Sequence, residues 1–233
     1  MTLSSRQNIV ELNTAKPNDL VAFGHYLQED LSVPSPILWR VLERTDNELF
    51  LLSDLILDCR RYHGKTAEVT WRDAVDITWQ DCDLRDWLNQ EFFETAFDPS
   101  EKKYIQTVLC QDNGEGSPDT NDKVFLLSVK EVLMAKDVLG VQGLKTTGTS
   151  YAKLKKEDGS NLYVYDLSKE ADYLVKEGQR MGCSWWWLRT QGNKASRAYF
   201  IGTQASLRSY ANVSCARDGI RPAIKIKLDS NHQ

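Results

Sequence analysis

The sequence predicts an α+β fold with an early β-hairpin, helices in the middle and a small twisted antiparallel sheet at the end. Residues 37–43 alternate in polarity and end at a Thr-Asp-Asn turn, and the apolar residues 49–53 follow as the return strand of a hairpin. Apolar residues between positions 84 and 92 recur every three or four residues, as on one face of a helix. The last third contains short apolar segments separated by glycine and small polar residues, which is typical of antiparallel strands.

The N-terminal half begins with a polar segment and continues into the hairpin and helices. Residues 1–18 are expected to form a flexible arm, and residues 20–24 are expected to form a strand. Asp81 and Asp83 bring negative charge to the start of the amphipathic helix, where the helix dipole favours it. A second short helix is expected to begin at Pro99.

The middle of the chain alternates between loop and helix. Residues 111–122 are rich in Asp, Asn and Gly and predict an exposed loop. A short buried strand is expected at 124–127, and Ser128 and Glu131 have the spacing of a capping box at the start of a helix. Residues 140–180 are polar and contain two weak helical patterns. These patterns lie at 149–156 and 169–176.

Three adjacent tryptophans, followed by leucine and arginine, organise the last third of the chain. A strand sends neighbouring side chains to opposite faces, so both faces of this strand need cover and at most one indole should be exposed. Residues 219–224 read Gly-Ile-Arg-Pro-Ala-Ile and are expected to pack beside it. The predicted structural core comprises Trp185, Trp186, Trp187, Arg189, Gly219, Arg221 and Pro222.

Composition narrows the classes of protein to which the chain can belong. With 233 residues and 41% hydrophobic residues, the chain has enough apolar material for a core, and its net charge of −4 argues against a nucleic-acid partner. No apolar stretch approaches the ~20 residues of a membrane span, so no membrane partner is expected. The first residues lack the pattern of a signal peptide. A cytoplasmic location is expected, with a phage particle or non-classical export as alternatives.

Motifs of enzymes and metal sites are scarce, and no cofactor or metal is expected. Nucleotide-binding, zinc-protease and serine-hydrolase motifs are absent from the sequence, and the five cysteines are scattered, as buried free thiols would be. The acidic loop 111–122 could supply oxygen ligands to calcium, but an exposed connection has the same composition. His63 stands beside Arg60, Arg61 and Tyr62 in either a ligand-facing loop or a surface turn.

The stretch from 197 to 217 is the candidate recognition surface. Tyr, Arg, Ser and Asn provide contact area and adaptable hydrogen bonds, as in binding surfaces. A solvated face of an antiparallel sheet would use many of the same residues, but the charged members are all arginine, which favours recognition. The predicted ligand-binding residues are Arg197, Tyr199, Gln204, Arg208, Ser209, Tyr210, Asn212, Ser214 and Arg217.

Six motifs, in the same order, resemble those of a bacterial and phage family of domains of unknown function. They are the early block beginning Asp19-Leu-Val-Ala-Phe-Gly and Ile37-Leu-Trp-Arg-Val-Leu, the segment Leu51-Leu-Ser-Asp-Leu-Ile-Leu-Asp-Cys-Arg, the helix from Trp79 to Phe97, the strand Asp122-Lys-Val-Phe-Leu-Leu-Ser-Val, Trp186-Trp-Leu-Arg-Thr and Gly219-Ile-Arg-Pro-Ala. The resemblance covers residues 19–228 as a single domain, with 229–233 as a tail. Residues 140–180 are longer and more polar than the family pattern, which indicates an insertion.

That family is similar to C-type-lectin-like domains, including formylglycine-generating enzymes. The resemblance implies a compact lectin-like domain with a small twisted antiparallel sheet, flanking helices and long loops. It also implies a binding role, because the stretch between the two closing motifs forms the ligand surface of related variable proteins. In some relatives, diversity-generating retroelements rewrite that stretch, and residues 195–217 have the composition that such rewriting yields.

The sequence favours a non-enzymatic module that binds a small ligand or a protein through residues 190–217. A structural or interaction subunit of a phage or bacterial assembly is an alternative that would use the same surface. A copper-dependent oxidase of the formylglycine-generating type is a third alternative. The candidate copper ligands would then be Cys183 and Cys215, although neither lies in the family's expected cysteine motif.

Overall fold

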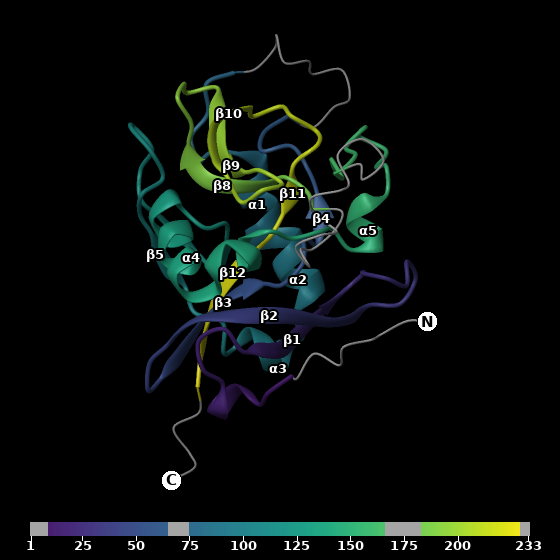
Figure 1. Cartoon of the computed structure of the whole chain (residues 1–233), viewed down its shortest axis with the longest axis vertical. Helices are drawn as coiled ribbons and strands as arrows, with labels where there is room; N and C mark the ends of the chain where they lie inside the picture. The colour runs from purple at the N-terminus through teal and green to yellow at the C-terminus, as the bar shows by residue number, and fades with distance from the viewer. Residues whose placement is uncertain (1–8, 65–74, 166–182, 229–233) are drawn as a thin grey trace.

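The computed structural model of the chain describes residues 9–64, 75–165 and 183–228. The fold is mixed α/β, with several antiparallel sheets and few helices (Figure 1). The strands are β1 (Leu20–Tyr26), β2 (Ser35–Arg44), β3 (Glu48–Ser53), β4 (Asp58–Cys59), β5 (Val108–Cys110), β6 (Thr120–Asp122), β7 (Val124–Phe125), β8 (Trp186–Gln191), β9 (Arg197–Ile201), β10 (Leu207–Asn212), β11 (Gly219–Ile220) and β12 (Ala223–Lys227). The helices are η1 (Leu12–Thr14), α1 (Asp83–Trp87), η2 (Leu88–Phe92), α2 (Phe93–Ala96), α3 (Pro99–Lys102), α4 (Val129–Leu144) and α5 (Ser150–Lys153).

The first sheet contains the hairpin that the alternating pattern predicted. Its strand order is β1-β2-β3-β12-β7, and every neighbouring pair is antiparallel. Strands β2 and β3 pair with Trp39 opposite Ser53, and the turn closes where the Thr45 N–H donates to the Glu48 carbonyl over 3.0 Å. This sheet lies in the lower half of Figure 1.

Part of the expected N-terminal arm packs against this sheet. Ile9 pairs with Leu20, and Ala15 is fully buried. The Arg44 guanidinium donates to the carbonyls of Leu12, Asn13 and Ala15 over 2.8 to 3.3 Å. These hydrogen bonds join residues about thirty positions apart, so local polarity alone gave no sign of them. Residues 1–8 of the arm and the expected tail at 229–233 lie outside the described residues.

The second sheet carries the tryptophan block. Its order is β10-β9-β8-β11-β4, with β8 and β11 parallel and the other pairs antiparallel. Trp186 and Trp187 are fully buried, whereas Trp185 is partly exposed, in agreement with the expectation of at most one exposed indole. The indole N–H groups of Trp186 and Trp187 donate to the carbonyls of Leu144 and Arg60. Buried indoles are usually satisfied in this way.

The sequence had led us to expect that the closing strands form one sheet. They belong to two sheets instead, because the chain crosses from one sheet to the other. Strand β11 belongs to the second sheet and β12 to the first, with Arg221 and Pro222 at the crossing. The buried Arg221 guanidinium donates to the carbonyls of Ser53 and Gly143 and lies 5.1 Å from the ring centre of Trp186. The Gly-Ile-Arg-Pro-Ala motif therefore joins the two sheets.

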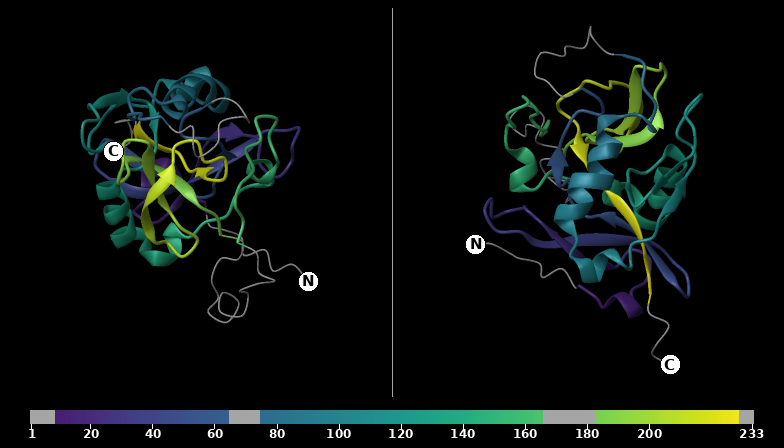
Figure 2. Two further views of the ribbon diagram at one scale, coloured as in Figure 1. Left: turned by 90° about the horizontal axis from the view of Figure 1, so that it is seen from above. Right: turned by 180° about the vertical axis from the view of Figure 1, so that it is seen from behind.

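The apolar spacing from 84 to 92 correctly predicted a helix, which runs from Asp83 to Ala96 through a π-helical turn at η2. Figure 2 shows this stretch from behind, between the two sheets. Short π-helical segments of this kind occur within α-helices. Leu84, Leu88 and Phe92 are buried, so the predicted face is the one that covers the core.

The predicted capping box begins α4. The Ser128 side chain accepts from the Glu131 N–H, and the Glu131 carboxylate accepts from the Ser128 N–H. The helix is interrupted at Gly140, where φ is +65°, a conformation that glycine adopts without strain. The expected helix at 149–156 is the single turn α5, and the one at 169–176 falls outside the described residues.

The acidic loop ends earlier than expected, because Thr120–Asp122 forms strand β6 and pairs with β5. Within the described ranges, no helix combines the length and the apolarity that a membrane span needs.

Candidate functional site

A hollow of about 480 Å³ lies beside the tryptophan block, within the stretch that the sequence identified as a recognition surface. We call it the aromatic hollow. Its lining residues come from the start of β8, from β9 and β10 with their connecting turn, and from the loop before β11. They are Trp185, Phe200, Gly202, Thr203, Gln204, Ser206, Arg208, Tyr210, Ala211, Cys215 and Asp218.

Three aromatic side chains form one wall of the aromatic hollow. Phe200 lies edge-on to Trp185, with ring centres 5.9 Å apart, and edge-on to Tyr210, with ring centres 5.5 Å apart. Tyr163 stacks on Trp185 at 3.9 Å. Tyr210 is 52% exposed, which leaves aromatic surface available to a ligand. Fixed, partly exposed rings provide contact area at a low cost in conformational entropy.

Asp218 also lines the aromatic hollow, although it is only 1% exposed. Within the part of the chain that the structure describes, neither of its carboxyl oxygens accepts a hydrogen bond. Burial raises the pKa of this carboxyl to about 7, while the Cys215 thiol and the Arg217 guanidinium act in the opposite direction. Buried polar groups are normally hydrogen-bonded, so an unsatisfied carboxyl in a hollow indicates a place for a donor.

The polar rim of the aromatic hollow comes from β10 and the turn before it. Arg208 is exposed, and its Nε donates to Ser206 Oγ over 3.2 Å. Gln204 lies at the exposed tip of the same turn. The turn follows Gly202, whose N–H donates to the Ser206 carbonyl over 2.8 Å. These side chains can exchange their contacts with solvent for contacts with a ligand.

Of the nine residues predicted to bind a ligand, the structure brings Gln204, Arg208 and Tyr210 to the aromatic hollow. All three come from β10 and the turn before it, and the pairing of β10 with β9 shifts register between Arg208 and Ala211, which interrupts simple strand alternation there. The remaining predicted residues have other surroundings. These are Arg197, Tyr199, Ser209, Asn212, Ser214 and Arg217.

Strand alternation and local turns explain most of these other positions. Tyr199 precedes Phe200 on β9 and packs against the hydrophobic core instead of lining the hollow. Asn212 accepts hydrogen bonds from the backbone and side chain of Ser214, which closes a turn. The Arg217 guanidinium lies 5.2 Å from the ring centre of Tyr163. These contacts support the shape of the surface.

Sequence reasoning missed several lining residues of the aromatic hollow. It assigned Trp185 to the core alone, considered Cys215 only as a copper ligand, and did not select Phe200 or Asp218. Period-two alternation relative to Tyr199 could have indicated Phe200. Asp218 stands in a loop next to a buried strand, and nothing in its local sequence reveals that it is buried and accepts no hydrogen bond from the described residues.

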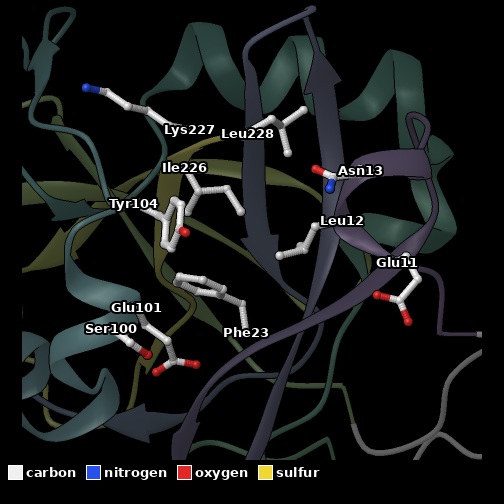
Figure 3. A pocket seen from close by; sticks show the side chains of 10 residues that line it. All are labelled: Glu11, Leu12, Asn13, Phe23, Ser100, Glu101, Tyr104, Ile226, Lys227 and Leu228. Atoms are coloured by element: carbon white, nitrogen blue, oxygen red, sulfur yellow. The ribbon is translucent and has the colours of Figure 1, made fainter. Parts of the chain in front are cut away.

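Further hollows lie elsewhere on the described part of the chain. One of about 290 Å³ lies beside η1, α3 and the end of β12, next to both ends of the described chain (Figure 3). Another, of about 410 Å³, is lined by Arg60 and Arg61 from the predicted basic cluster. Arg61 donates to Asp158, while Arg60 contacts Asp58 and lies over the Trp87 ring. The charges of that cluster are therefore largely engaged within the protein.

His63 and Tyr62 of the same cluster also have partners in the fold. His63 Nδ1 lies 3.1 Å from an Asp83 carboxylate oxygen, and the Tyr62 hydroxyl donates to the Arg189 carbonyl over 2.8 Å. Tyr62 is fully buried. These contacts anchor the segment to α1 and β8, which favours the interpretation of the cluster as a structural turn.

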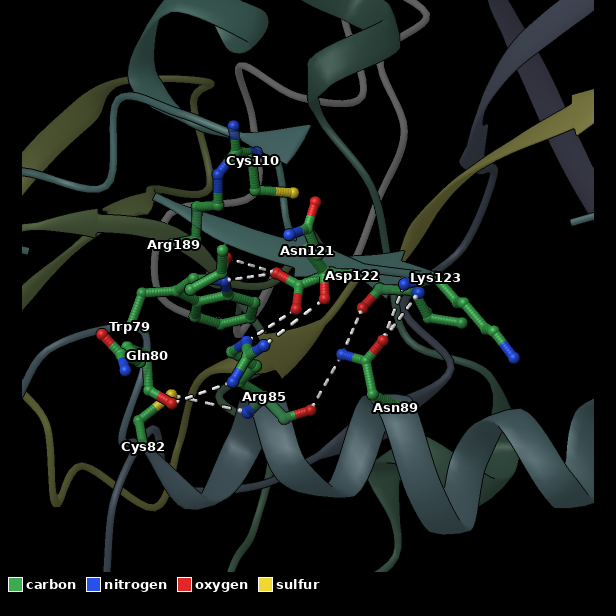
Figure 4. A network of polar contacts seen from close by, with 12 residues as sticks. Trp79, Gln80, Cys82, Arg85, Asn89, Cys110, Asn121, Asp122, Lys123 and Arg189 are labelled. Atoms are coloured by element: carbon green, nitrogen blue, oxygen red, sulfur yellow. Dashed lines mark hydrogen bonds and ion pairs between the residues drawn. The ribbon is translucent and has the colours of Figure 1, made fainter. Parts of the chain in front are cut away.

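The acidic loop is tied into the scaffold by two buried charges. Asp122 accepts from Trp79 Nε1 over 2.9 Å, from Thr120 Oγ1 over 2.7 Å and from Arg85 Nε over 2.6 Å (Figure 4). Arg189 donates to Asn113 Oδ1, to the carbonyls of Gln111 and Leu126 and to the Glu131 carboxylate. These hydrogen bonds give the charges of Asp122 and Arg189 a structural role.

The two cysteines of the copper alternative lie in different surroundings. Cys183 is fully buried, and its carbonyl accepts from the Tyr165 N–H. Cys215 lines the aromatic hollow, where burial raises the pKa of its thiol well above the usual range. A raised pKa disfavours the thiolate that binds copper or acts as a nucleophile.

The fold and the hollow describe a mixed α/β domain with an aromatic, carboxyl-containing cavity at the edge of its second sheet. A family-wide sequence profile described as "Domain of unknown function (DUF6273)" matches residues 46–228, and the chain belongs to that family. Strands β1 and β2 both precede the matched residues, although they pair within the same sheet as β3. No curated protein and no solved structure matches the chain.

Proposed function

We propose that the protein is a non-enzymatic binding module whose ligand, a small molecule or a side chain of a protein partner, occupies the aromatic hollow. The observation that carries this proposal is the combination of exposed aromatic surface with the buried Asp218 carboxyl, which accepts no hydrogen bond from the described residues. Binding sites typically join an apolar wall to a few convergent polar groups. Arg208 and Gln204 at the rim would add adaptable hydrogen bonds.

The surroundings of the hollow support a binding role because they are fixed. Trp186 and Trp187 follow Trp185, lie on β8 and are fully buried. Arg189 on the same strand is held by several hydrogen bonds. A ligand therefore meets side chains that are already ordered, which lowers the entropic cost of binding.

We further propose that the domain has a C-type-lectin-like arrangement. Support comes from the two closing motifs, which lie side by side: Gly219 pairs with Trp186, and the Gly219 N–H donates to the Trp185 carbonyl over 2.8 Å. The small second sheet and the long loops agree with that arrangement. Diversification of residues 195–217 stays a prediction, which a neighbouring reverse transcriptase gene with a template repeat would support.

The test is a fragment screen followed by ¹H–¹⁵N NMR. We expect fragments to shift the indole resonance of Trp185, assigned with Trp185→Phe, and to leave those of Trp186 and Trp187 nearly unchanged. The double variant Arg208→Ala, Tyr210→Ala should weaken these fragments by about tenfold or more, because hot-spot arginine and tyrosine side chains commonly contribute over 1 kcal/mol each. Its melting temperature should change little, since both side chains are exposed.

A matched control is Lys194→Ala, which removes an exposed charge from the turn before β9, outside the lining of the hollow. It should bind fragments as the wild type does. The proposed function is wrong if no chemically diverse fragment reaches the aromatic hollow, or if the double variant loses stability in proportion to binding.

A further inference from the structure

We propose that the natural ligand of the aromatic hollow presents a protonated primary amine on an apolar body, with the ammonium group against Asp218 and the apolar body against Trp185, Phe200 and Tyr210. This inference rests on the proposed function and adds the chemical class of the ligand. The inference follows from the hydrogen-bond donors that the described residues do not provide to Asp218 and from the aromatic side chains that line the hollow.

Hydrogen-bond donors are what Asp218 lacks. Its two carboxyl oxygens have no hydrogen-bond partner among the described residues, yet the residue is almost completely buried. An ionised carboxylate can only accept hydrogen bonds, and an ammonium group offers three donors with a compensating charge. A buried charge is tolerated when it is both paired and hydrogen-bonded. A ligand ammonium would supply both requirements.

The neighbouring cation does not already provide this partner. Arg217 is close enough to favour the charged form of Asp218, but its guanidinium lies over Tyr163, 5.2 Å from the ring centre. Arg217 is also exposed, so solvent screens its charge. Cys215 offers only a thiol, which is a weak donor. No other described residue donates a hydrogen bond to this carboxyl, so a donor carried by a ligand would satisfy it.

The aromatic wall favours the same class of ligand. Ring faces attract cations, and the attraction is stronger where water is excluded. The wall also provides apolar surface for the carbon skeleton that bears the amine. An anionic ligand would meet the charge of the almost completely buried Asp218, and among the lining residues the positive charge is that of Arg208 at the exposed rim.

A set of near-isosteric probes tests the ligand class. The probes are 2-phenylethylamine, 2-phenylethanol and 3-phenylpropionate, titrated by NMR at pH 8 into the wild-type protein. We expect the amine to bind at least tenfold more tightly than the alcohol, because charge-assisted hydrogen bonds are about twice as strong as neutral ones. The carboxylate should bind least. Lysine with its α-amine acetylated and its carboxyl amidated then tests whether a protein side chain can replace the free amine.

The variant Asp218→Asn separates the carboxyl from the wall of the hollow. It should reduce the affinity for the amine by about tenfold or more, to the level of the alcohol, and leave the affinity for the alcohol unchanged. Asp137→Asn makes the same change of net charge on the exposed side of α4 and should have no effect. A retained Trp185 indole resonance would show that each variant keeps the wall intact.

The outcomes distinguish the two proposals. If the wild-type protein binds the alcohol or the carboxylate as tightly as the amine, the ligand class is wrong and the proposed binding function stands. The same conclusion follows if Asp218→Asn keeps its preference for the amine. If none of these probes and no fragment of the wider screen reaches the aromatic hollow, both proposals fail. The comparison of probes on the wild-type protein needs no variant to fold.

Discussion

Two buried aspartates in this protein have opposite surroundings. Asp122 and Asp218 are each 1% exposed. Asp122 accepts three hydrogen bonds, from an indole, a hydroxyl and a guanidinium. Asp218 accepts none from the residues that the structure describes. Equal burial therefore has different consequences: a satisfied carboxylate holds the fold together, and an unsatisfied one in a hollow leaves a position for a ligand.

The aromatic side chains near each aspartate differ in the same way. Beside Asp122, Trp79 packs against Tyr62, which in turn packs edge-on against Trp187, and all three rings are buried. Beside Asp218, the rings of Trp185, Phe200 and Tyr210 end in an exposed tyrosine. Similar residue types therefore close one region and leave the other open.

The largest expected effect follows from Asp122→Asn. Removing the negative charge leaves Arg85 without its buried partner and places an amide N–H among donors, so we expect the free energy of unfolding to fall by about 4 kcal/mol. Urea denaturation at pH 7 measures it. Asp119→Asn, an exposed change in the same loop, should stay within about 0.5 kcal/mol of the wild type. A small effect of Asp122→Asn would contradict the structural role of this network.

The second prediction concerns the pH dependence of stability at Asp218. Its pKa is raised to about 7 in the folded protein from 3.8, so the folded state binds more protons than the unfolded state between these values. Stability from this group therefore falls as the pH rises from about 4 to 7. Asp218→Asn removes that loss. The free energy of unfolding of the variant, relative to that of the wild type, should therefore increase by about 3 kcal/mol as the pH rises from 4.5 to 8.

Urea denaturation of both proteins at the two pH values checks this prediction, with Asp137→Asn as the control that should show no such change. A constant difference between Asp218→Asn and the wild type would mean that the Asp218 carboxyl is already satisfied. The contrast between the two aspartates would then disappear.

The smallest effect compares two tryptophans of the block. Trp187→Phe removes a fully buried indole and its hydrogen bond to the Arg60 carbonyl, so we expect a loss of about 2 kcal/mol. Trp185→Phe changes a partly exposed ring at the aromatic hollow and should cost less than about 1 kcal/mol. Thermal or urea denaturation ranks the two variants. The reverse order would show that the hollow, and not the closed region, supports the fold.

Much of the local structure could be read from the sequence because it depends on neighbouring residues. The alternation in polarity along residues 37–43 and the turn at residues 45–47 identified the hairpin. The spacing of Ser128 and Glu131 identified the start of α4. The tryptophan block correctly indicated a strand with both faces covered. These features arise from periodicity and from capping, which act over a few residues.

Features that depend on distant contacts could not be read in this way. The sequence placed residues 9–18 in a flexible arm. The guanidinium that binds carbonyls of this segment belongs to Arg44, which is too distant in sequence for a local pattern to indicate the contact. The sequence also placed the closing strands in one sheet. The crossing at Arg221 depends on hydrogen bonds to Ser53 and Gly143, which a local pattern does not show. Each of these contacts joins parts of the chain that are far apart in sequence.

The sequence by itself determined the mixed class of fold, the hairpin and the main helices. Only the tertiary structure decided which residues between positions 190 and 217 share a hollow, since the turn before β10 and the register shift within β10 set their positions. The tertiary structure alone also showed that Asp122 accepts several hydrogen bonds, whereas Asp218 accepts none from the described residues. The physical reason is that the state of a buried carboxyl depends on the donors that the fold brings to it, and a sequence does not show these donors.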